Sequence, residues 1–126
     1  MIVGNWHGGK LRDDASGGSS VRLAEIIVVD ETLAWLRSLL PDVTIVLLGD
    51  FNAEKGAPEL APLFERGLVL ATESCAGATK ITDGTIVDHI WVWPAAGRPI
   101  RELTSCIVYG LEEASDHRPV VATFEI

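Results

Sequence analysis

A chain of 126 residues, 48% of them hydrophobic, is long enough for one domain with a single core. Its net charge of −8, with scattered lysines and arginines, argues against a protein that binds long duplex DNA through a basic surface, but not against an enzyme that holds a few phosphates through a metal. No apolar run approaches the ~20 residues of a membrane span, and the N-terminal residues lack the order of a signal peptide, so a cytoplasmic location without membrane contact is expected.

The first third of the chain predicts a strand, a loop and a long helix. Residues 1–7 form a short apolar run, and residues 8–20 are expected to form a loop in which Ser19 or Ser20 caps the next helix. Leucine and isoleucine recur at helical spacing over residues 21–40. The polar side chains of this helix expected to face solvent are Glu25, Glu31 and Arg37.

The rest of the chain predicts strands with short loops and one short helix. Residues 44–48 are β-branched and apolar without alternation, which is typical of a buried strand. Pro58 and Gly67 bracket a short helix over residues 57–66. The other predicted strands are residues 68–71, a hairpin of 78–82 and 86–93, and then 103–109 and 120–126. This order indicates a layered α/β domain over residues 1–126.

The two cysteines give no sign of a metal site or of a disulfide framework. Cys75 and Cys106 do not have the spacing of metal-binding pairs. We expect two reduced, partly buried thiols.

Gly49-Asp50-Phe51-Asn52 follows the buried strand, at a strand-to-loop junction of the kind that often carries chemistry. In extended backbone Asp50 and Asn52 would share one face while Phe51 points to the core. A carboxylate can orient or deprotonate a water, and an amide can donate a hydrogen bond to a phosphoryl oxygen. An ordinary turn is the alternative, because these residue types are common in turns.

A second polar group precedes the last strand. Asp116 can bind a hard cation such as Mg²⁺, and His117 can act as a general acid or base when a carboxylate orients it. Asp88 lies in an otherwise apolar strand and needs a partner, for which His117 is the natural candidate. The alternatives are a solvated loop before the terminal strand and an exposed strand face at Asp88.

The other two histidines carry weaker signals. His89 alternates with Asp88, so it should face the other side of the sheet, in packing or at the surface. His7 follows a short strand, where a lone histidine is more often structural.

The order of these motifs resembles the endonuclease/exonuclease/phosphatase family, which has the pancreatic DNase-like fold. The resemblance runs from His7 to Ile126 and is carried by a strand ending in histidine, a long helix, and the motifs GDFN, VDHI and SDHRPV. Residues 3–7 resemble the family's central histidine strand, and Thr79 matches a threonine common between the second and third motifs. The implied fold class is α/β (α+β). It is half of a DNase I-like four-layer sandwich, with one mixed, largely antiparallel sheet and a long and a short helix on one face.

The resemblance also implies catalytic roles. Asp50 would position or activate the attacking water, and Asn52 would hold the scissile phosphate. Asp88 would orient His117, which would contact the phosphate and act in acid/base catalysis. His7 would be the second catalytic histidine.

A divalent metal, Mg²⁺ or Mn²⁺, is implied as well, with Asp116 as its carboxylate ligand. The expected metal-site residues are Asp50, Asn52 and Asp116. The residues beside the first histidine, Trp6 and Gly8, depart from the family's usual pattern.

Family members are about twice as long, and their N-terminal half supplies a metal-binding glutamate. No carboxylate before residue 50 lies on a suitable buried strand, so that glutamate is expected to be absent here. The strands would then expose an apolar sheet face around Leu48, Ile90, Val92, Ile107 and Val121. Such a patch is rarely left in water, which predicts cover by a homodimer partner or a separate N-terminal half.

Two functions follow from the sequence. One is a metal-dependent phosphoesterase, of phosphodiesterase or nuclease type, acting on nucleic acid or a small phosphodiester. The other is an inactive or incomplete half-domain, acting as a fragment or as an assembly or binding module that needs a partner chain.

Overall fold

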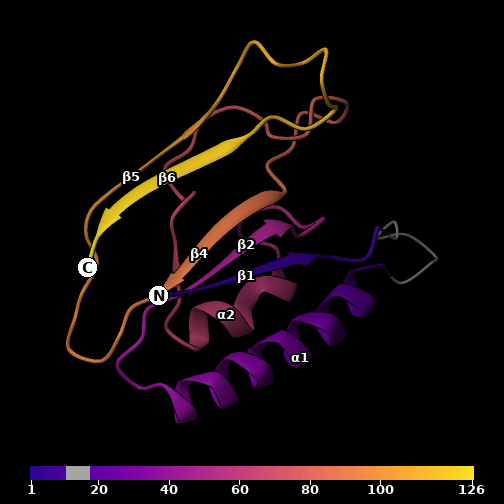
Figure 1. Ribbon diagram of the computed structural model, residues 1–126. Coiled ribbons are helices and arrows are strands. Elements are labelled where there is room, and N and C mark those ends of the chain that lie inside the picture. The colour runs from indigo at the N-terminus through magenta and orange to yellow at the C-terminus, as the bar shows by residue number, and fades with distance from the viewer. Residues whose placement is uncertain (11–17) are drawn as a thin grey trace.

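The computed structural model describes residues 1–10 and 18–126. Of the loop predicted over residues 8–20, residues 11–17 therefore lie outside the described part. The elements in chain order are β1 (Ile2–His7), α1 (Gly18–Leu39), β2 (Ile45–Asp50), the short 3₁₀ helix η1 (Pro58–Leu60), α2 (Ala61–Glu65), β3 (Val69–Leu70), β4 (Asp88–Trp93), β5 (Arg101–Ile107) and β6 (Val120–Glu125) (Figure 1).

Four strands form a mixed sheet in the order β1-β2-β4-β3. β1 runs parallel to β2, while β4 runs antiparallel to both β2 and β3. β5 and β6 pair antiparallel as a separate two-stranded sheet. The predicted fold class is confirmed, with the difference that the strands divide into two sheets.

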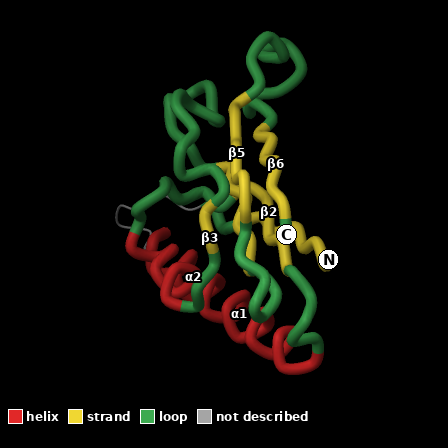
Figure 2. The backbone as a smooth tube through the Cα atoms, turned by 90° about the vertical axis from the view of Figure 1, so that its left-hand side faces the viewer, coloured by secondary structure: helices red, strands yellow, loops and turns green. Residues whose placement is uncertain are grey.

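The two helices cover one face of the four-stranded sheet (Figure 2). The main core lies between these helices and the sheet. Ile26 and Leu33 of α1 are buried there, as the helical spacing predicted. The sheet, α2 and the turn after β2 contribute further large side chains to this core, among them Ile45, Leu47, Phe51, Leu63 and Trp91. Burial of this apolar surface supplies the main driving force for folding.

The opposite face of the sheet is partly covered by the β5–β6 hairpin. Leu103 and Phe124 pack toward Val92, which is fully buried. The expectation of a wholly exposed apolar face is therefore wrong at Val92 and Ile107, because the hairpin folds over the sheet. Of the other residues in that prediction, Leu48 and Ile90 are half-buried and Val121 is exposed.

α1 begins earlier than predicted, so Ser19 and Ser20 lie inside the helix. The Ser19 hydroxyl instead donates to Glu59, which also forms a buried ion pair with Arg22 at 2.9 Å. Arg37, expected to face solvent, is half-buried and donates to four backbone carbonyls near the end of α1 and of β4. Arg22 thus joins α1 to η1, and Arg37 joins α1 to the segments that follow α1 and β4.

The hairpin predicted over residues 78–93 forms only in part. β4 begins at Asp88, and before it Lys80 and Thr85 make a single antiparallel bridge. Gly84, with φ of +71°, fits the left-handed position of the predicted turn. Cys75 and Cys106 are free thiols, as expected, but Cys75 is buried and Cys106 is exposed, so the expectation that both are partly buried is wrong at Cys106.

No helix in residues 1–10 and 18–126 has the length and apolarity needed to cross a membrane.

Candidate active site

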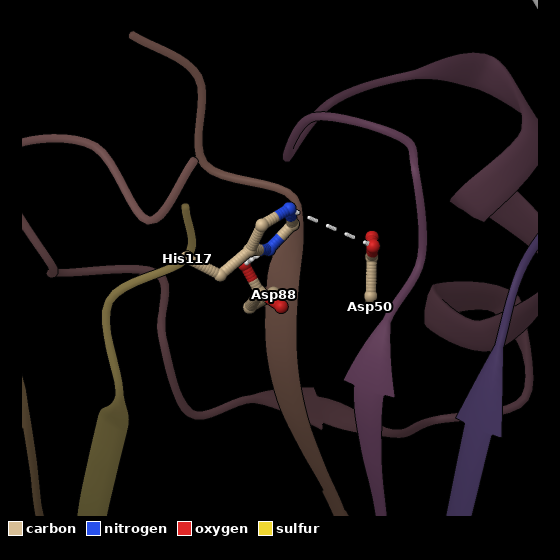
Figure 3. A group of neighbouring side chains, drawn as sticks. All are labelled: Asp50, Asp88 and His117. Atoms are coloured by element: carbon tan, nitrogen blue, oxygen red, sulfur yellow. Dashed lines mark hydrogen bonds and ion pairs between the residues drawn. The ribbon is translucent and has the colours of Figure 1, made fainter. Parts of the chain in front are cut away.

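Three polar side chains predicted from separate motifs meet at one end of the sheets. Asp50 ends β2 and Asp88 begins β4, and the antiparallel register places these two residues opposite each other. His117 lies just before β6 and reaches the same point (Figure 3). One ligand atom of each residue lies within 4.8 Å of the others. Residues 50, 88 and 117 thus form one cluster, which we call the acidic–histidine cluster.

His117 is held in one orientation by Asp88. Its Nδ1–H donates to Asp88 Oδ2 at 2.8 Å, which directs Nε2 to Asp50 Oδ2 at 4.0 Å (Figure 3). In the neutral imidazole, Nε2 is then the basic nitrogen. Between a fifth and a quarter of each of the three side chains is exposed, so a ligand can reach them. This carboxylate–imidazole pair has the geometry of a general acid/base.

Residues 79–81 hold both members of this pair. The fully buried Thr79 hydroxyl accepts hydrogen bonds from the backbone N–H groups of Val87 at 3.0 Å and Asp88 at 3.2 Å. The same segment bonds to the other loop, because Arg118 N–H donates to Thr79 O at 2.7 Å and Ile81 N–H donates to Asp116 O at 2.9 Å. One short segment therefore fixes Asp88 relative to the residues around His117.

The turn at Asp50 depends on a glycine before it. Gly49 has φ of +145°, and a Cβ added there would lie 1.8 Å from the carbonyl oxygen of Trp6 on β1. Only glycine allows the strands to approach this closely. Asp50 Oδ1 accepts the Asn52 backbone N–H at 2.8 Å, which stabilises the turn and leaves Oδ2 facing the cluster.

Asn52 departs from the predicted strand geometry. Phe51 is fully buried, as expected, but Asn52 has φ of +48°, a left-handed conformation that asparagine tolerates. Its side-chain amide donates to Gly8 O at 2.9 Å. The structure therefore places Asn52 on the turn after Asp50, with its side-chain amide bonded to Gly8.

The remaining predicted residues lie at different distances from the cluster. His7 pairs with Asp50 in the β1–β2 register, and its Nε2 lies 3.7 Å from Asp50 Oδ2, with 72% of the side chain exposed. Asp116 is exposed. Within residues 1–10 and 18–126, one group of histidine, cysteine or carboxylate side chains has its ligand atoms close enough to hold a metal ion, and it is the acidic–histidine cluster. Asp116 does not belong to it.

His89 supports the site from the other side of β4. It is buried, and its Nε2–H donates to Ala53 O at 2.8 Å while Nδ1 accepts from the Thr72 hydroxyl at 3.2 Å. Burial lowers the pKa of this imidazole, which keeps it neutral. The sequence predicted that His89 faces the other side of the sheet, in packing or at the surface, and the structure shows it packed. Its bond to Ala53, just after Asn52, was not predicted, and no sequence signal pointed to Thr72.

The acidic–histidine cluster opens into a cleft with a volume of about 410 Å³. Leu48, Ile90 and Val120 form its apolar wall. Arg118 also lines the cleft, but its guanidinium donates to Glu112 at 3.0 Å and to Ala78 O at 2.9 Å. The cleft thus presents two carboxylates and a histidine, with its arginine already engaged by other groups.

No family model and no curated protein matches the sequence. Solved structures do match. A functionally unknown conserved protein from Enterococcus faecalis has a TM-score of 0.70 at 19% identity, over 98% of this chain and 49% of that one. The mannosyl-6-phosphatase of Bacteroides thetaiotaomicron has a TM-score of 0.65 at 19% identity, over 97% and 50%. An endonuclease/exonuclease/phosphatase family protein from Bacteroides thetaiotaomicron has a TM-score of 0.62 at 20% identity, over 92% and 45%.

These likenesses establish the fold. The chain has the fold of about half of a DNase I-like domain, as found in solved endonuclease/exonuclease/phosphatase proteins, and it spans about half the length of these structures.

Proposed function

We propose that this chain carries the acid/base half of a divalent-metal-dependent phosphoesterase site. The reaction is hydrolysis of a phosphate ester, as in a phosphodiesterase or a nuclease. The observation that carries the proposal is the Asp88–His117 pair directed at Asp50 within an open cleft. The fold it shares with a phosphatase and with an endonuclease/exonuclease/phosphatase protein supports the same chemistry.

In this proposal the cluster residues divide the proton chemistry. His117, held by Asp88 at Nδ1, exchanges a proton at Nε2 with the reacting oxygen. Asp50 Oδ2 orients the attacking water, and His7, 3.7 Å away, contacts the phosphate from the β1 side. Asn52 joins the Asp50 turn to Gly8 through its side-chain amide, and its predicted contact with the scissile phosphate is kept as part of the proposal.

The charge of the cleft supports a bound cation. A phosphate anion would be repelled by Asp50 and Asp88, and the nearby Arg118 is committed to other partners. Carboxylate oxygens fit the preference of Mg²⁺ and Mn²⁺ for hard ligands, so the donor set fits such an ion. Asp50 Oδ2 is the ligand already directed into the cluster. Asp116, which lies outside the cluster, and Asn52 remain proposed ligands. Such an ion, when bound, would polarise the phosphate and stabilise the leaving oxygen.

A second candidate function is an incomplete half-domain that needs a partner chain. It is favoured by one observation: the matched structures are about twice the length of this chain. In this case a second copy or a separate N-terminal half would supply the missing ligands, and the substrate, nucleic acid or a small phosphodiester, would bind between the two parts.

Hydrolysis of bis(p-nitrophenyl) phosphate with and without Mn²⁺ or Mg²⁺ tests the first function. Metal-dependent turnover that is lost in Asp50→Ala and in His117→Ala is the expected result. Equal background rates in the wild type and both variants would favour the incomplete half-domain. Calorimetric titration with Mn²⁺ gives a second readout, because Asp50→Ala should weaken metal binding whether or not the chain turns over substrate.

A further inference from the structure

Arg118 follows His117 in the chain and bonds twice to the segment that holds Asp88. Its backbone N–H donates to Thr79 O at 2.7 Å, and its Nη1 donates to Ala78 O at 2.9 Å. The Thr79 hydroxyl in turn accepts the backbone N–H of Asp88 at 3.2 Å. Arg118 therefore connects the backbone beside His117 directly to the segment that fixes the backbone of Asp88.

The same guanidinium holds the loop between β5 and β6, which lies at the end of the sheets where the cluster is (Figure 1). Its Nε donates to Glu112 Oε1 at 3.0 Å, and its Cζ lies 4.8 Å from the centre of the Tyr109 ring, a distance at which a cation and an aromatic ring attract each other. Gly77 makes room for this ring, because a Cβ added there would lie 2.0 Å from the Tyr109 hydroxyl oxygen. Three segments of the chain thus meet at the side chain of Arg118.

The bonds of Arg118 fix the plane of its guanidinium. A guanidinium presents its N–H donors in set directions, so simultaneous bonds from Nε and Nη1 leave the group one orientation. Only 18% of the side chain is exposed, although it lines the cleft. A cation held in this way is suited to tie its neighbours together and is poorly suited to follow a substrate phosphate.

His117 needs such a tie because it lies in a loop. The residue precedes β6, and its ring reaches Asp88 across the space between two segments that are 29 residues apart in the chain. Loops are more mobile than the elements they connect, whereas a general acid/base must be held close to its productive geometry. The 2.8 Å bond between His117 Nδ1 and Asp88 Oδ2 thus depends on contacts that hold the two segments together.

We propose that Arg118 is a positioning residue, which keeps the His117 ring within hydrogen-bond reach of Asp88 by tying the loop before β6 to residues 77–79. The inference rests on the proposed acid/base role of His117 and adds to it a residue that acts through this ring. Without the guanidinium, the bonds to Glu112 and Ala78 are lost, and the His117 ring should leave Asp88 for part of the time.

Nitrogen NMR of the His117 ring in the metal-free protein tests the proposal without phosphoesterase activity. Arg118→Met keeps a long apolar stem without a donor, and Arg118→Lys keeps the charge but not the fork that bonds in two directions. In both variants the tautomer balance should shift from Nδ1–H toward Nε2–H, and Nδ1–H should exchange with water about tenfold faster or more. Arg98→Met, at an exposed loop arginine, makes the same change of charge and should leave the His117 signals in place.

Turnover of bis(p-nitrophenyl) phosphate with Mn²⁺ separates positioning from substrate binding. A misplaced His117 should lower kcat about 10- to 100-fold in Arg118→Met and leave KM within about twofold of the wild type. A raised KM with an unchanged kcat would mean that Arg118 binds the phosphate itself, and would overturn the proposal. Arg98→Met should change neither constant.

A further variant keeps the test open if the Arg118 variants fail to fold, which circular dichroism shows. Glu112→Ala removes one of the two side-chain bonds and leaves Arg118 in place, so it should shift the His117 tautomer balance in the same direction by a smaller amount. Wild-type ring signals in either folded Arg118 variant, or in Glu112→Ala when those variants are unfolded, would overturn the proposal. A wild type without turnover would count against the proposed function alone, because the ring signals still report whether Arg118 holds His117.

Discussion

The hydroxyl of Thr79 accepts the backbone N–H of Asp88, nine residues later in the chain, inside the protein. The same oxygen accepts the N–H of Val87, so one side chain satisfies two donors at the start of β4. The buried Thr79 thus fixes the backbone of Asp88, whose carboxylate holds His117.

Replacement of Thr79 by valine should leave these two N–H groups without a partner. The shape of the side chain is preserved, so the loss is mainly that of the hydrogen bonds, and each buried unsatisfied donor costs about 1–3 kcal/mol. Thr79→Ser keeps the oxygen and should lose less. Urea unfolding of the three proteins measures the difference, and equal stability of the valine and serine variants would show that the hydroxyl is not needed.

Gly49→Ala should be among the most destabilising single changes in the chain. The added methyl group would lie 1.8 Å from Trp6 O, so β1 must move away from β2. We expect a loss of about 3 kcal/mol or more, at the large end of single-mutation effects.

Gly56→Ala is the matched control for that change. Gly56 also has a positive φ, +88°, but no atom of the described residues outside its immediate chain neighbours lies within 4 Å of its added Cβ. It should cost only the backbone strain of about 1–2 kcal/mol. Similar losses at both positions in thermal unfolding would show that the contact with Trp6 is relieved at little cost.

The ion pair between Arg22 and Glu59 should behave as a buried unit. Both residues are 3% exposed, and Arg22 Nη2 lies 2.9 Å from Glu59 Oε1. Arg22→Met alone would leave a buried carboxylate without its charge partner and should cost about 3–5 kcal/mol. The double variant Arg22→Met/Glu59→Leu should recover much of that loss. A double-mutant cycle by chemical denaturation checks this, and additive losses would contradict it.

His89 should make the fold sensitive to mild acid. Burial lowers its pKa in the folded state, so below the unfolded pKa of about 6.5 the unfolded chain binds a proton that the folded chain does not. The stability that neutral His89 contributes is fully present above that pH. It falls by up to about 1.4 kcal/mol per pH unit as the pH decreases toward the lowered pKa of His89 in the folded state. His89→Gln, which keeps a donor and an acceptor, should flatten the curve between pH 7.5 and 5.5. The same slope in both proteins would assign the effect to other groups.

These residues also show how far the sequence predicts this structure. The strand, the long helix and the Asp88–His117 pair follow from local patterns, because a carboxylate in an otherwise apolar strand needs a partner. The family resemblance adds Asp50 to this pair. The turn at Asn52 does not, because its left-handed backbone depends on a contact with Gly8, 44 residues earlier. The covered sheet face was missed for a related reason, since no local pattern indicates that β5 and β6 leave the main sheet.

Asp88→Asn tests the pair on which the proposed chemistry depends. Asparagine keeps the size of the side chain but removes its charge. If the amide nitrogen faces His117 Nδ1, it favours a proton on Nε2; if the amide oxygen faces Nδ1, the hydrogen bond stays but is no longer made to a charged group. In the phosphodiester assay the rate should fall by about 10²–10⁴-fold, the usual range for a general acid/base.

Nitrogen NMR of the His117 ring gives a readout for Asp88→Asn that does not depend on turnover. In the neutral ring of the wild type the proton should reside on Nδ1, which donates to Asp88 Oδ2 at 2.8 Å, and Nε2 should have the chemical shift of an unprotonated nitrogen. The variant should shift the tautomer balance toward a proton on Nε2. His89, bonded to Ala53 and Thr72 on the other face of β4, is the internal control whose signals should stay in place. If the His117 ring shows the same tautomer in both proteins, Asp88 does not orient it.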